Sequence, residues 1–91
     1  MPLVPTADPG HHHFASDIVH FYMDDGDRHI RCGISRLALE LLEPELPPTK
    51  EGRIEAFKQH RRRIERAASA KFDRGELEPD GTVSLGTADL V

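Results

Sequence analysis

The stretch from Thr49 to Gly75 limits the possible folds of this chain more than any other segment. Pro47 and Pro48 cannot continue an earlier helix, and the Thr49 hydroxyl can cap a new one by accepting a hydrogen bond from a backbone amide. At the other end, Gly75 can adopt the left-handed conformation that ends a helix, and basic residues lie in the turn before it. These signals predict one long helix over residues 49–75.

This predicted helix is apolar on one side and basic on the other. The apolar residues fall within an arc of about 80° and are Ile54, Phe57, Ile64, Ala68 and Phe72. The opposite side holds Lys50, Arg53, Gln59, Arg62, Arg63 and Arg66. Arg61 breaks the pattern because it lies inside the apolar arc. It is either an arginine at the rim of the core, with Glu65 as a candidate partner, or an arginine held at the bottom of a cleft to bind an anion.

A β-hairpin is predicted over residues 17–34, with residues 24–27 (DDGD) as its turn, because Asp-Gly is a strong turn signal. If Asp24 pairs with Asp27, the apolar residues of both strands share one face, directed toward the helices. They are Val19, Phe21, Ile30, Cys32 and Ile34. The other face carries what we call the open-face cluster, with the expected cross-strand pairs Tyr22 with His29 and His20 with Arg31. A slip of one residue would mix the two faces and is disfavoured.

Three further elements complete the predicted domain. Ser35 can cap a short helix that Pro44 ends, with Leu37, Ala38, Leu41 and Leu42 available for burial. Leu46 can pack just before the long helix, and the alternation in residues 82–85 predicts a third short strand. The order β-β-α-α-β predicts a two-layer α+β domain, an antiparallel sheet with both helices on one face. We expect the third strand beside the second and antiparallel to it.

The first thirteen residues are predicted to be a disordered lead. Three prolines, a glycine and few apolar residues cannot bury enough surface to fold. Residues 14–91 then form a single α+β domain, which suits the size of the chain. The run His11–His13 lacks the geometry of a designed metal site, so we predict neither a metal site nor a cofactor.

The composition argues against several classes of protein. The single cysteine, Cys32, cannot form a disulfide within the chain and suits a reducing compartment. No apolar run approaches the ~20 residues of a membrane span, and no signal peptide is recognisable. We therefore expect a cytoplasmic protein with no membrane contact. The net charge of −4 argues against generic nucleic-acid binding, although residues 58–66 are basic.

Three stretches, taken in order, resemble a known family: residues 19–35 (VHFYMDDGDRHIRCGIS), 37–43 (LALELLE) and 55–90 (EAFKQHRRRIERAASAKFDRGELEPDGTVSLGTADL). They are similar to a small bacterial family catalogued as a domain of unknown function, DUF1488, over about residues 17–90. The matching positions are Phe21, Asp25, Gly26, Cys32, Ser35, Leu39, Phe57, His60, Arg61, Ile64, Lys71, Phe72, Gly75 and Asp89. The resemblance implies this fold and a bacterial cytoplasmic setting, and it implies no reaction.

The residues favour a non-enzymatic protein-interaction or regulatory module. It would bind an unknown protein partner, or a second copy of itself, through the open sheet face or a strand edge. The candidate binding residues are the open-face cluster (His20, Tyr22, His29 and Arg31) together with His60 and Arg61 on the long helix. No residue is predicted to be catalytic.

Two alternatives stay open. The chain could be a nucleic-acid accessory protein in which Arg62, Arg63 and Arg66 contact phosphates, although no aromatic residues interleave with them. It could also be a small enzyme with Cys32 as nucleophile, His60 as base and Arg61 as anion binder. A structural role competes with the second alternative, because a lone cysteine at an inward strand position is usually a small buried apolar residue.

Overall fold

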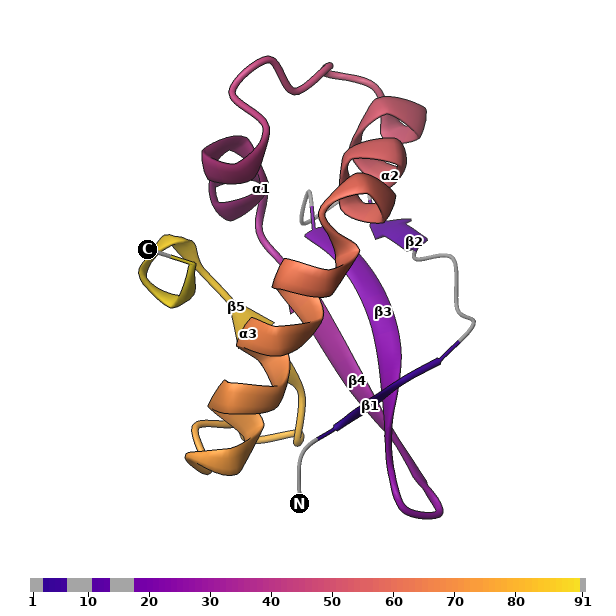
Figure 1. Cartoon of the computed structure of the whole chain (residues 1–91), viewed down its shortest axis with the longest axis vertical. Helices are drawn as coiled ribbons and strands as arrows, with labels where there is room; N and C mark the ends of the chain where they lie inside the picture. Colours follow the sequence, from indigo (N-terminus) through magenta and orange to yellow (C-terminus); the bar gives the residue numbers. More distant parts are fainter. Residues whose placement is uncertain (1–2, 7–10, 14–17, 91) are drawn as a thin grey trace.

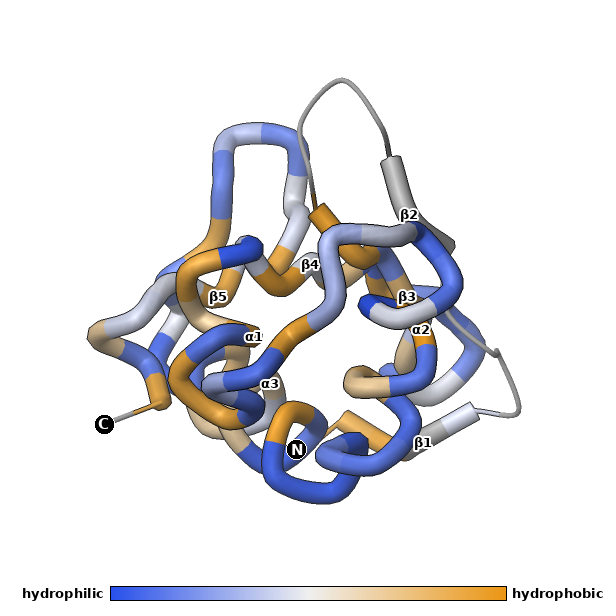
Figure 2. Tube along the Cα trace, turned by 90° about the horizontal axis from the view of Figure 1, so that it is seen from above, coloured by the Kyte–Doolittle hydropathy of each residue, from blue (hydrophilic) through white to orange (hydrophobic). Residues whose placement is uncertain are grey.

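A computed structural model describes residues 3–6, 11–13 and 18–90 of the chain. These residues form two layers, a mixed five-stranded sheet and the helices that pack on it (Figure 1). Figure 2 shows the three α-helices on one side of the strands. The predicted α+β class and the placement of the helices on one face are confirmed. Within these residues, no helix is both long enough and apolar enough to cross a bilayer.

The predicted hairpin is formed by β3 (Ile18–Asp25) and β4 (Arg28–Ile34), but its register differs from the prediction. Phe21 pairs with Cys32 rather than with Ile30, because the turn is centred on Gly26 and Asp27. Gly26 has a φ of 60°, and the favoured two-residue hairpin turns require a positive φ at this first central position. Glycine adopts that conformation without strain, which favours this turn over one with Asp25 in the same place.

The difference in register leaves the two faces of the hairpin as predicted. The register changes by two residues, and side chains alternate between faces with a period of two. The inward residues Val19, Phe21, Cys32 and Ile34 are therefore buried as expected. Met23 joins them in the core, and Ile30 packs against its edge.

The short helix α1 (Arg36–Leu42) begins as predicted but buries different residues. The backbone amide of Ala38 donates a hydrogen bond to the Ser35 hydroxyl over 3.2 Å. Ala38 and Leu39 are buried, whereas Leu37 and Leu41 are 57% and 49% exposed, so their predicted burial is wrong. A seven-residue helix with apolar side chains around most of its circumference gives no periodic signal for choosing the buried side.

The predicted long helix is two helices, α2 (Lys50–Gln59) and α3 (Arg61–Asp73). The helix breaks at His60, whose φ and ψ are −105° and 16°. No proline or glycine lies at the break. Instead, α2 packs against β2 and β3 while α3 packs against β5, so the two halves follow different parts of a twisted sheet. Arg53, predicted on the polar side of one straight helix, is buried on α2.

Both outer ends of this helical pair are as predicted. The Gly52 amide donates a hydrogen bond to the Thr49 hydroxyl over 3.1 Å. Gly75 has a φ of 73°, and its amide donates to the carbonyl of Phe72. The next amide donates to the carbonyl of Lys71, which completes a Schellman-type end.

The third predicted strand, β5 (Val83–Leu85), lies beside β4 as expected but runs parallel to it. The prediction of an antiparallel strand is wrong. It assumed that the two predicted helices run in opposite directions along the sheet, so that the chain would enter the third strand at the end where the second strand finished. Figure 1 shows that α1 continues away from the end of β4, and that α2 and α3 together make a single return pass. The chain therefore re-enters the sheet at the end where β4 began. A 3₁₀ helix, η1 (Thr87–Asp89), follows and packs against α1.

Part of the predicted disordered lead pairs with the sheet. The strands β1 (Val4–Pro5) and β2 (His11–His13) both run antiparallel to β3. Leu3 is buried in the core, and its amide donates a hydrogen bond to the Ser69 hydroxyl over 3.0 Å. The prediction failed for these residues because it counted only their own apolar side chains and not the backbone partners that β3 offers. Residues 1–2 and 7–10 lie outside the described residues.

The packing at the start of α2 predicts that a Gly-to-Ala change there makes the protein less stable. A Cβ atom at Gly52 would lie 2.5 Å from Cβ of Pro47, which is closer than real side chains approach. Gly52→Ala is therefore expected to lower the free energy of unfolding by about 1–3 kcal/mol, although Gly-to-Ala changes inside helices usually raise it. Urea unfolding followed by circular dichroism measures the change. Glu55→Ala, at an exposed position of the same helix, is the control, and a more stable Gly52→Ala variant would contradict this packing.

Candidate functional site

The open-face cluster lies on the side of the sheet that the helices leave uncovered. Its cross-strand partners differ from the prediction because of the changed register. Tyr22 is paired with Arg31, whereas His20 is paired with Gly33 and His29 with Asp24. The predicted pairs of Tyr22 with His29 and of His20 with Arg31 are therefore wrong, although all four residues share the expected face.

Contacts divide this cluster into two parts. Near the hairpin turn, Nδ1 of His29 lies 2.6 Å from Oδ1 of Asp24. In the middle of the sheet, Nη2 of Arg31 lies 3.5 Å from Nε2 of His20. Tyr22 remains 40% exposed beside them. The central part thus offers an aromatic ring, an imidazole and a guanidinium on one surface.

A hollow of about 440 Å³ adjoins this central part. It is lined by Ile18, His20, Arg31, Gly33, Glu78, Pro79, Asp80, Thr82 and Ser84. Gly33 forms part of its floor, and a Cβ atom there would lie 3.0 Å from the Ile18 side chain and 3.3 Å from Nδ1 of His20. The absence of a side chain at Gly33 therefore makes room for the histidine ring. We call this region the sheet hollow.

The loop before β5 forms one wall of the sheet hollow, a role that the sequence analysis did not predict. The Glu78 amide donates to the Thr82 carbonyl over 2.9 Å, and Gly81 has a φ of 87°. The Thr82 amide donates to Oδ1 of Asp80 over 2.9 Å. Hydrogen bonds from Thr82 lower the pKa of Asp80, and the charge of Arg31 acts in the same direction. The hollow is thus lined by the guanidinium of Arg31 and by the carboxylate of Asp80.

Arg61 lies at the rim of the core and has three identified contacts. Its Nε donates to Oε2 of Glu65 over 3.0 Å, which confirms the predicted partner. Its Nη2 donates to the carbonyl of Thr6 over 2.9 Å, and its guanidinium lies 5.2 Å from the centre of the Phe57 ring. These contacts tie α3 to α2 and to the N-terminal segment, as expected for a structural arginine.

The three residues proposed for an enzyme are not brought together by polar contacts. His60 interacts with Glu43, with 3.4 Å between Nε2 and Oε2. The Cys32 thiol is fully buried and points to the Ile30 carbonyl, 3.6 Å away. In the part of the chain that the structure describes, no hydrogen bond joins Cys32 to His60 or Arg61. Burial, with the negative charge of Glu65 nearby, raises the pKa of Cys32 to about 12.

The raised pKa of Cys32 predicts a specific loss of stability at high pH. The folded chain keeps the thiol proton up to about pH 12, whereas the unfolded chain releases it near its ordinary value of 9.0. The free energy of unfolding should therefore fall as pH rises above 9, by up to ~1.4 kcal/mol per unit. Urea unfolding of the wild type and of Cys32→Ala at several pH values isolates this slope, because the variant lacks it.

Thiol reagents give an independent check. The native thiol is expected to react far more slowly than the same thiol in urea. Rapid reaction of the native protein would contradict this account and would strengthen the enzyme alternative.

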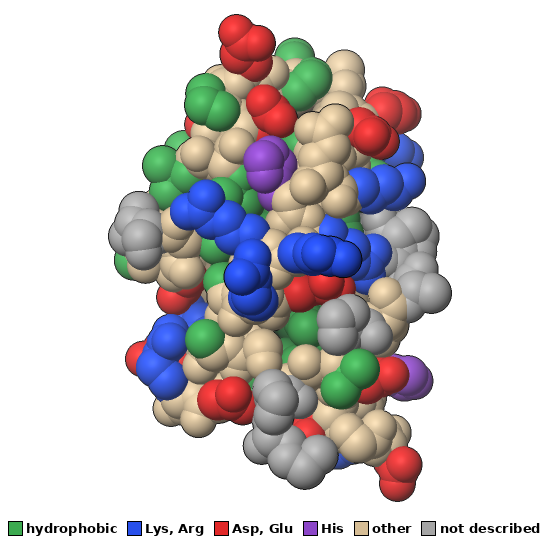
Figure 3. Space-filling view, in the orientation of Figure 1, with side chains coloured by type: hydrophobic (Ala, Val, Ile, Leu, Met, Phe, Trp, Pro, Cys, Tyr) green, Lys and Arg blue, Asp and Glu red, His purple; other side chains and the backbone are tan. Residues whose placement is uncertain are grey.

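The basic residues of α3 lie on the helical side of the molecule. Arg62 and Arg66 are exposed, whereas Arg63 donates from Nη2 to the Leu90 carbonyl over 2.9 Å. Figure 3 shows Lys and Arg side chains gathered across the middle of this side, with acidic side chains toward both ends. A hollow of about 550 Å³ lies among them at the junction of α2 and α3.

A second ion pair holds the C-terminal segment in place. Nζ of Lys71 donates to Oδ2 of Asp89 over 3.0 Å and to the Ser84 carbonyl over 2.7 Å. Burial opposes ionisation of Asp89, but hydrogen bonds from Gly86 and Lys71, with the charges of Lys71 and Arg74, lower its pKa below the ordinary value. Lys71 and Asp89 therefore have a structural role. Among the residues described, no group of three His, Cys, Asp or Glu side chains is arranged to hold a metal ion.

Comparison with known proteins identifies relatives of unknown function. The family described as "Protein of unknown function (DUF1488)" matches residues 8–85. Among solved structures, the chain is similar to a protein of unknown function from the DUF1488 family of Shewanella loihica PV-4. The two are 21% identical with a TM-score of 0.84, and the match covers 92% of this chain and 91% of that chain. At this identity the likeness concerns the fold. No curated protein matches the chain.

Proposed function

The chain belongs to the DUF1488 family, as its motifs indicated, and since that family has no known function, we propose from the geometry that it is a non-enzymatic protein-interaction module. The observation that carries this proposal is the uncovered face of the sheet. Helices cover the opposite face, while Tyr22, His20 and Arg31 stand beside the sheet hollow. Aromatic and arginine side chains around a concave surface are typical of the centre of a protein interface.

The face of the sheet suits this role better than its edges do. On the outer edge of β3, pairing is divided between two very short strands, β1 and β2. At the other edge, β5 has only three residues, and Lys71 already donates to the carbonyl of Ser84. Short strands and lysine side chains are common means of preventing strand addition. A partner that extends the sheet would therefore find little free backbone.

The chemistry of the face indicates the kind of partner. Ile18 and Gly33 give the sheet hollow an apolar floor, whereas Arg31 and Asp80 carry opposite charges at its side. A protein segment that places one apolar side chain in the hollow, with charged groups of both signs around it, would match this surface. We therefore expect another protein chain as the partner.

The environment of Cys32 supports the non-enzymatic part of the proposal. A nucleophilic cysteine requires an exposed thiolate, and burial of this thiol opposes its ionisation. The polar contacts of His60 and Arg61 are those expected of residues that fix the helices. We expect the module to act in the cytoplasm, because a single cysteine suits a reducing compartment.

The proposal is tested by replacing exposed side chains of the uncovered sheet face without disturbing the core. The double variant Tyr22→Ser, Arg31→Ser and the control Arg36→Ser, Glu40→Ser on α1 are each tagged, as is the wild type. Proteins captured from the native host are identified, and each candidate is then purified and titrated calorimetrically against all three baits. Light scattering of the purified chain reports self-association.

We expect one partner, or a second copy, to bind the wild type and the control equally. Its affinity for the face variant should be at least about tenfold lower, because hot-spot side chains contribute 2 kcal/mol or more. A partner that binds the face variant as tightly as the wild type would contradict the proposal.

A further inference from the structure

The helical side of the molecule carries a second site, distinct from the sheet hollow. We propose that the hollow at the α2–α3 junction binds a compact polyphosphate anion. We call it the basic hollow, and it is lined by Lys58, Gln59, His60, Arg61, Arg62, Arg63, Glu65 and Arg66. Its volume of about 550 Å³ is in the range of small-molecule sites.

Three of the cations that line the basic hollow are not engaged by other side chains among the described residues. Lys58, Arg62 and Arg66 lie four residues apart along the helices, and all three are exposed. Neither a hydrogen bond nor an ion pair joins any of them to another residue that the structure describes. Arg62 and Arg66 lie four residues apart on α3 and so share one side of that helix, and Lys58 lines the same hollow from the end of α2.

Two more arginines are held in place by the protein. Arg61 is fixed by Glu65 and by the Thr6 carbonyl, and Arg63 by the Leu90 carbonyl. A guanidinium has five N–H donors, so Arg63 retains donors that a ligand could use. Arginines fixed in this way lose little side-chain entropy when a ligand binds.

Among the described residues, Glu65 is the one carboxylate that lines the basic hollow, and it does not cancel the charge of the hollow. Glu65 is 7% exposed and lies 3.0 Å from Nε of Arg61, so its charge is already paired. The net field at this surface therefore favours an anion with several charges.

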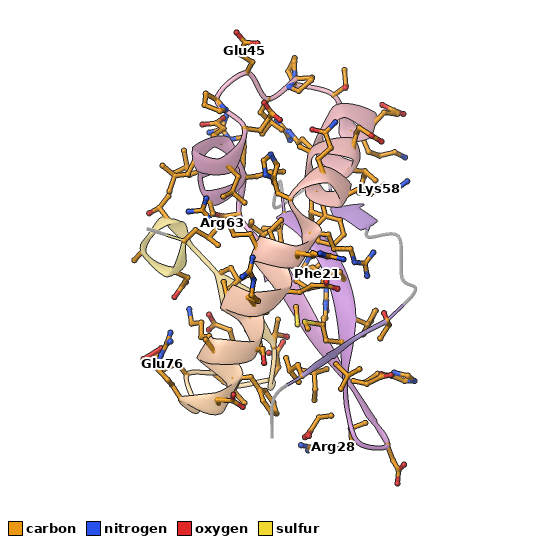
Figure 4. The ribbon with its side chains drawn as sticks, viewed as in Figure 1. Phe21, Arg28, Glu45, Lys58, Arg63 and Glu76 are labelled. Atoms are coloured by element: carbon orange, nitrogen blue, oxygen red, sulfur yellow. The ribbon has the colours of Figure 1, made fainter. Side chains whose placement is uncertain are left out.

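Acidic residues at both ends restrict the length of that anion. Figure 4 places Lys58 and Arg63 between Glu45, near one end of the molecule, and Glu76, near the other. Glu51 lies in the first turn of α2, and Asp73 is the last residue of α3. A long nucleic acid lying along the helices would meet these charges on a chain whose net charge is −4. A di- or triphosphate concentrates its charge within a few ångströms and avoids them.

Phosphate also suits the donors better than an acidic peptide does. Arginine forks bind phosphate oxygens in pairs, and a polyphosphate presents several such oxygens to the side chains that line the hollow. An acidic peptide spreads its carboxylates along a backbone, at ~3.3 Å per extended residue, and so toward the acidic ends. Among the residues that the structure describes, no Phe, Tyr or Trp lines the hollow to stack on a base, which indicates that the phosphate groups themselves would be recognised.

The test uses inorganic tripolyphosphate as the probe and the whole chain as the receptor. Amide chemical shifts of ¹⁵N-labelled protein are followed at low and at physiological salt. We expect saturable shifts centred on residues 58–66, and binding at least about tenfold weaker in the variant Arg62→Gln, Arg66→Gln. The control Arg36→Gln, Lys50→Gln changes the net charge equally at another surface and should bind like the wild type.

Further probes separate phosphate from other anions. A nucleoside triphosphate should bind with an affinity similar to that of tripolyphosphate, whereas single-stranded and duplex DNA and a glutamate-rich peptide should bind more weakly. Tighter binding of DNA with a steep salt dependence, or of the peptide, would overturn the proposal. Equal loss of binding in both double variants would also overturn it, because only net charge would then matter. Thermal melts establish that each variant is folded.

Discussion

Replacing Phe57 by alanine is expected to lower the free energy of unfolding by about 3–5 kcal/mol. The ring is fully buried, its centre lies 4.9 Å from that of Phe21, and Arg61 lies over it. The change removes buried apolar surface and an aromatic contact, and it leaves a cavity between the sheet and α2. A domain of this length has a total stability of about 5–14 kcal/mol, so the loss is a large part of it.

Urea unfolding followed by far-ultraviolet circular dichroism measures the Phe57→Ala effect. Leu37→Ala is the matched control, because Leu37 is an apolar residue on the exposed side of α1. Its effect should stay below about 1 kcal/mol. Similar effects for the two variants would mean that the centre of the core lies elsewhere.

Removing the charge of Glu65 should have the second largest effect. Glu65→Gln removes the carboxylate that lies 3.0 Å from the Arg61 guanidinium at a half-buried site, and we expect a loss of about 2–4 kcal/mol. This is somewhat less than for a fully buried pair, because Arg61 keeps 21% of its side chain exposed. Added salt should restore little of the stability, because buried pairs are weakly screened.

A double-mutant cycle separates the ion pair from the other contacts of Arg61. Arg61→Met and Glu65→Leu are measured singly and together by urea unfolding. We expect the double variant to be more stable than the sum of the single effects implies, by at least about 1 kcal/mol, because both members of the Arg61–Glu65 pair are then removed together. Strictly additive effects would show that the pair contributes nothing as a pair.

Periodicity and local signals predicted the parts of the fold that depend on one segment at a time. The inward face of the hairpin, the caps at Ser35 and Thr49 and the glycine end at Gly75 all follow from residues close in the chain. The inward position of Arg61 could be predicted in the same way, since Arg61 lies inside the apolar arc of the helix. Its contact with Thr6 could not, because 55 residues separate the two.

The features that the sequence did not reveal depend on the shape of the whole sheet. No local sequence signal predicts the break at His60. The break is explained by the packing of α2 and α3 against different strands. The parallel direction of β5 and the burial of Arg53 have the same origin. Likewise β1 and β2 gain their backbone partners from β3, which no count of their own apolar residues could show.

For each candidate site, the sequence predicted some of the residues but not the shape of the surface. The four residues of the open-face cluster share the expected face, but the wall of the sheet hollow comes from the loop around Asp80, far along the chain. The basic side of the helices was visible as the run at residues 58–66. Its hollow shape was not, because it depends on the break between α2 and α3.

The parallel pairing of β4 and β5 bears on the order in which the molecule folds. Strand β5 can join the sheet only after residues 35–82 have crossed one face, so its contacts are among the most distant in sequence and the slowest to close. Until then one edge of β4 is open, and the sites that Val83 and Leu85 fill in the core are empty. An unpaired edge beside exposed apolar surface is prone to aggregation. We therefore expect the protein to be prone to aggregation in the interval before β5 pairs with β4.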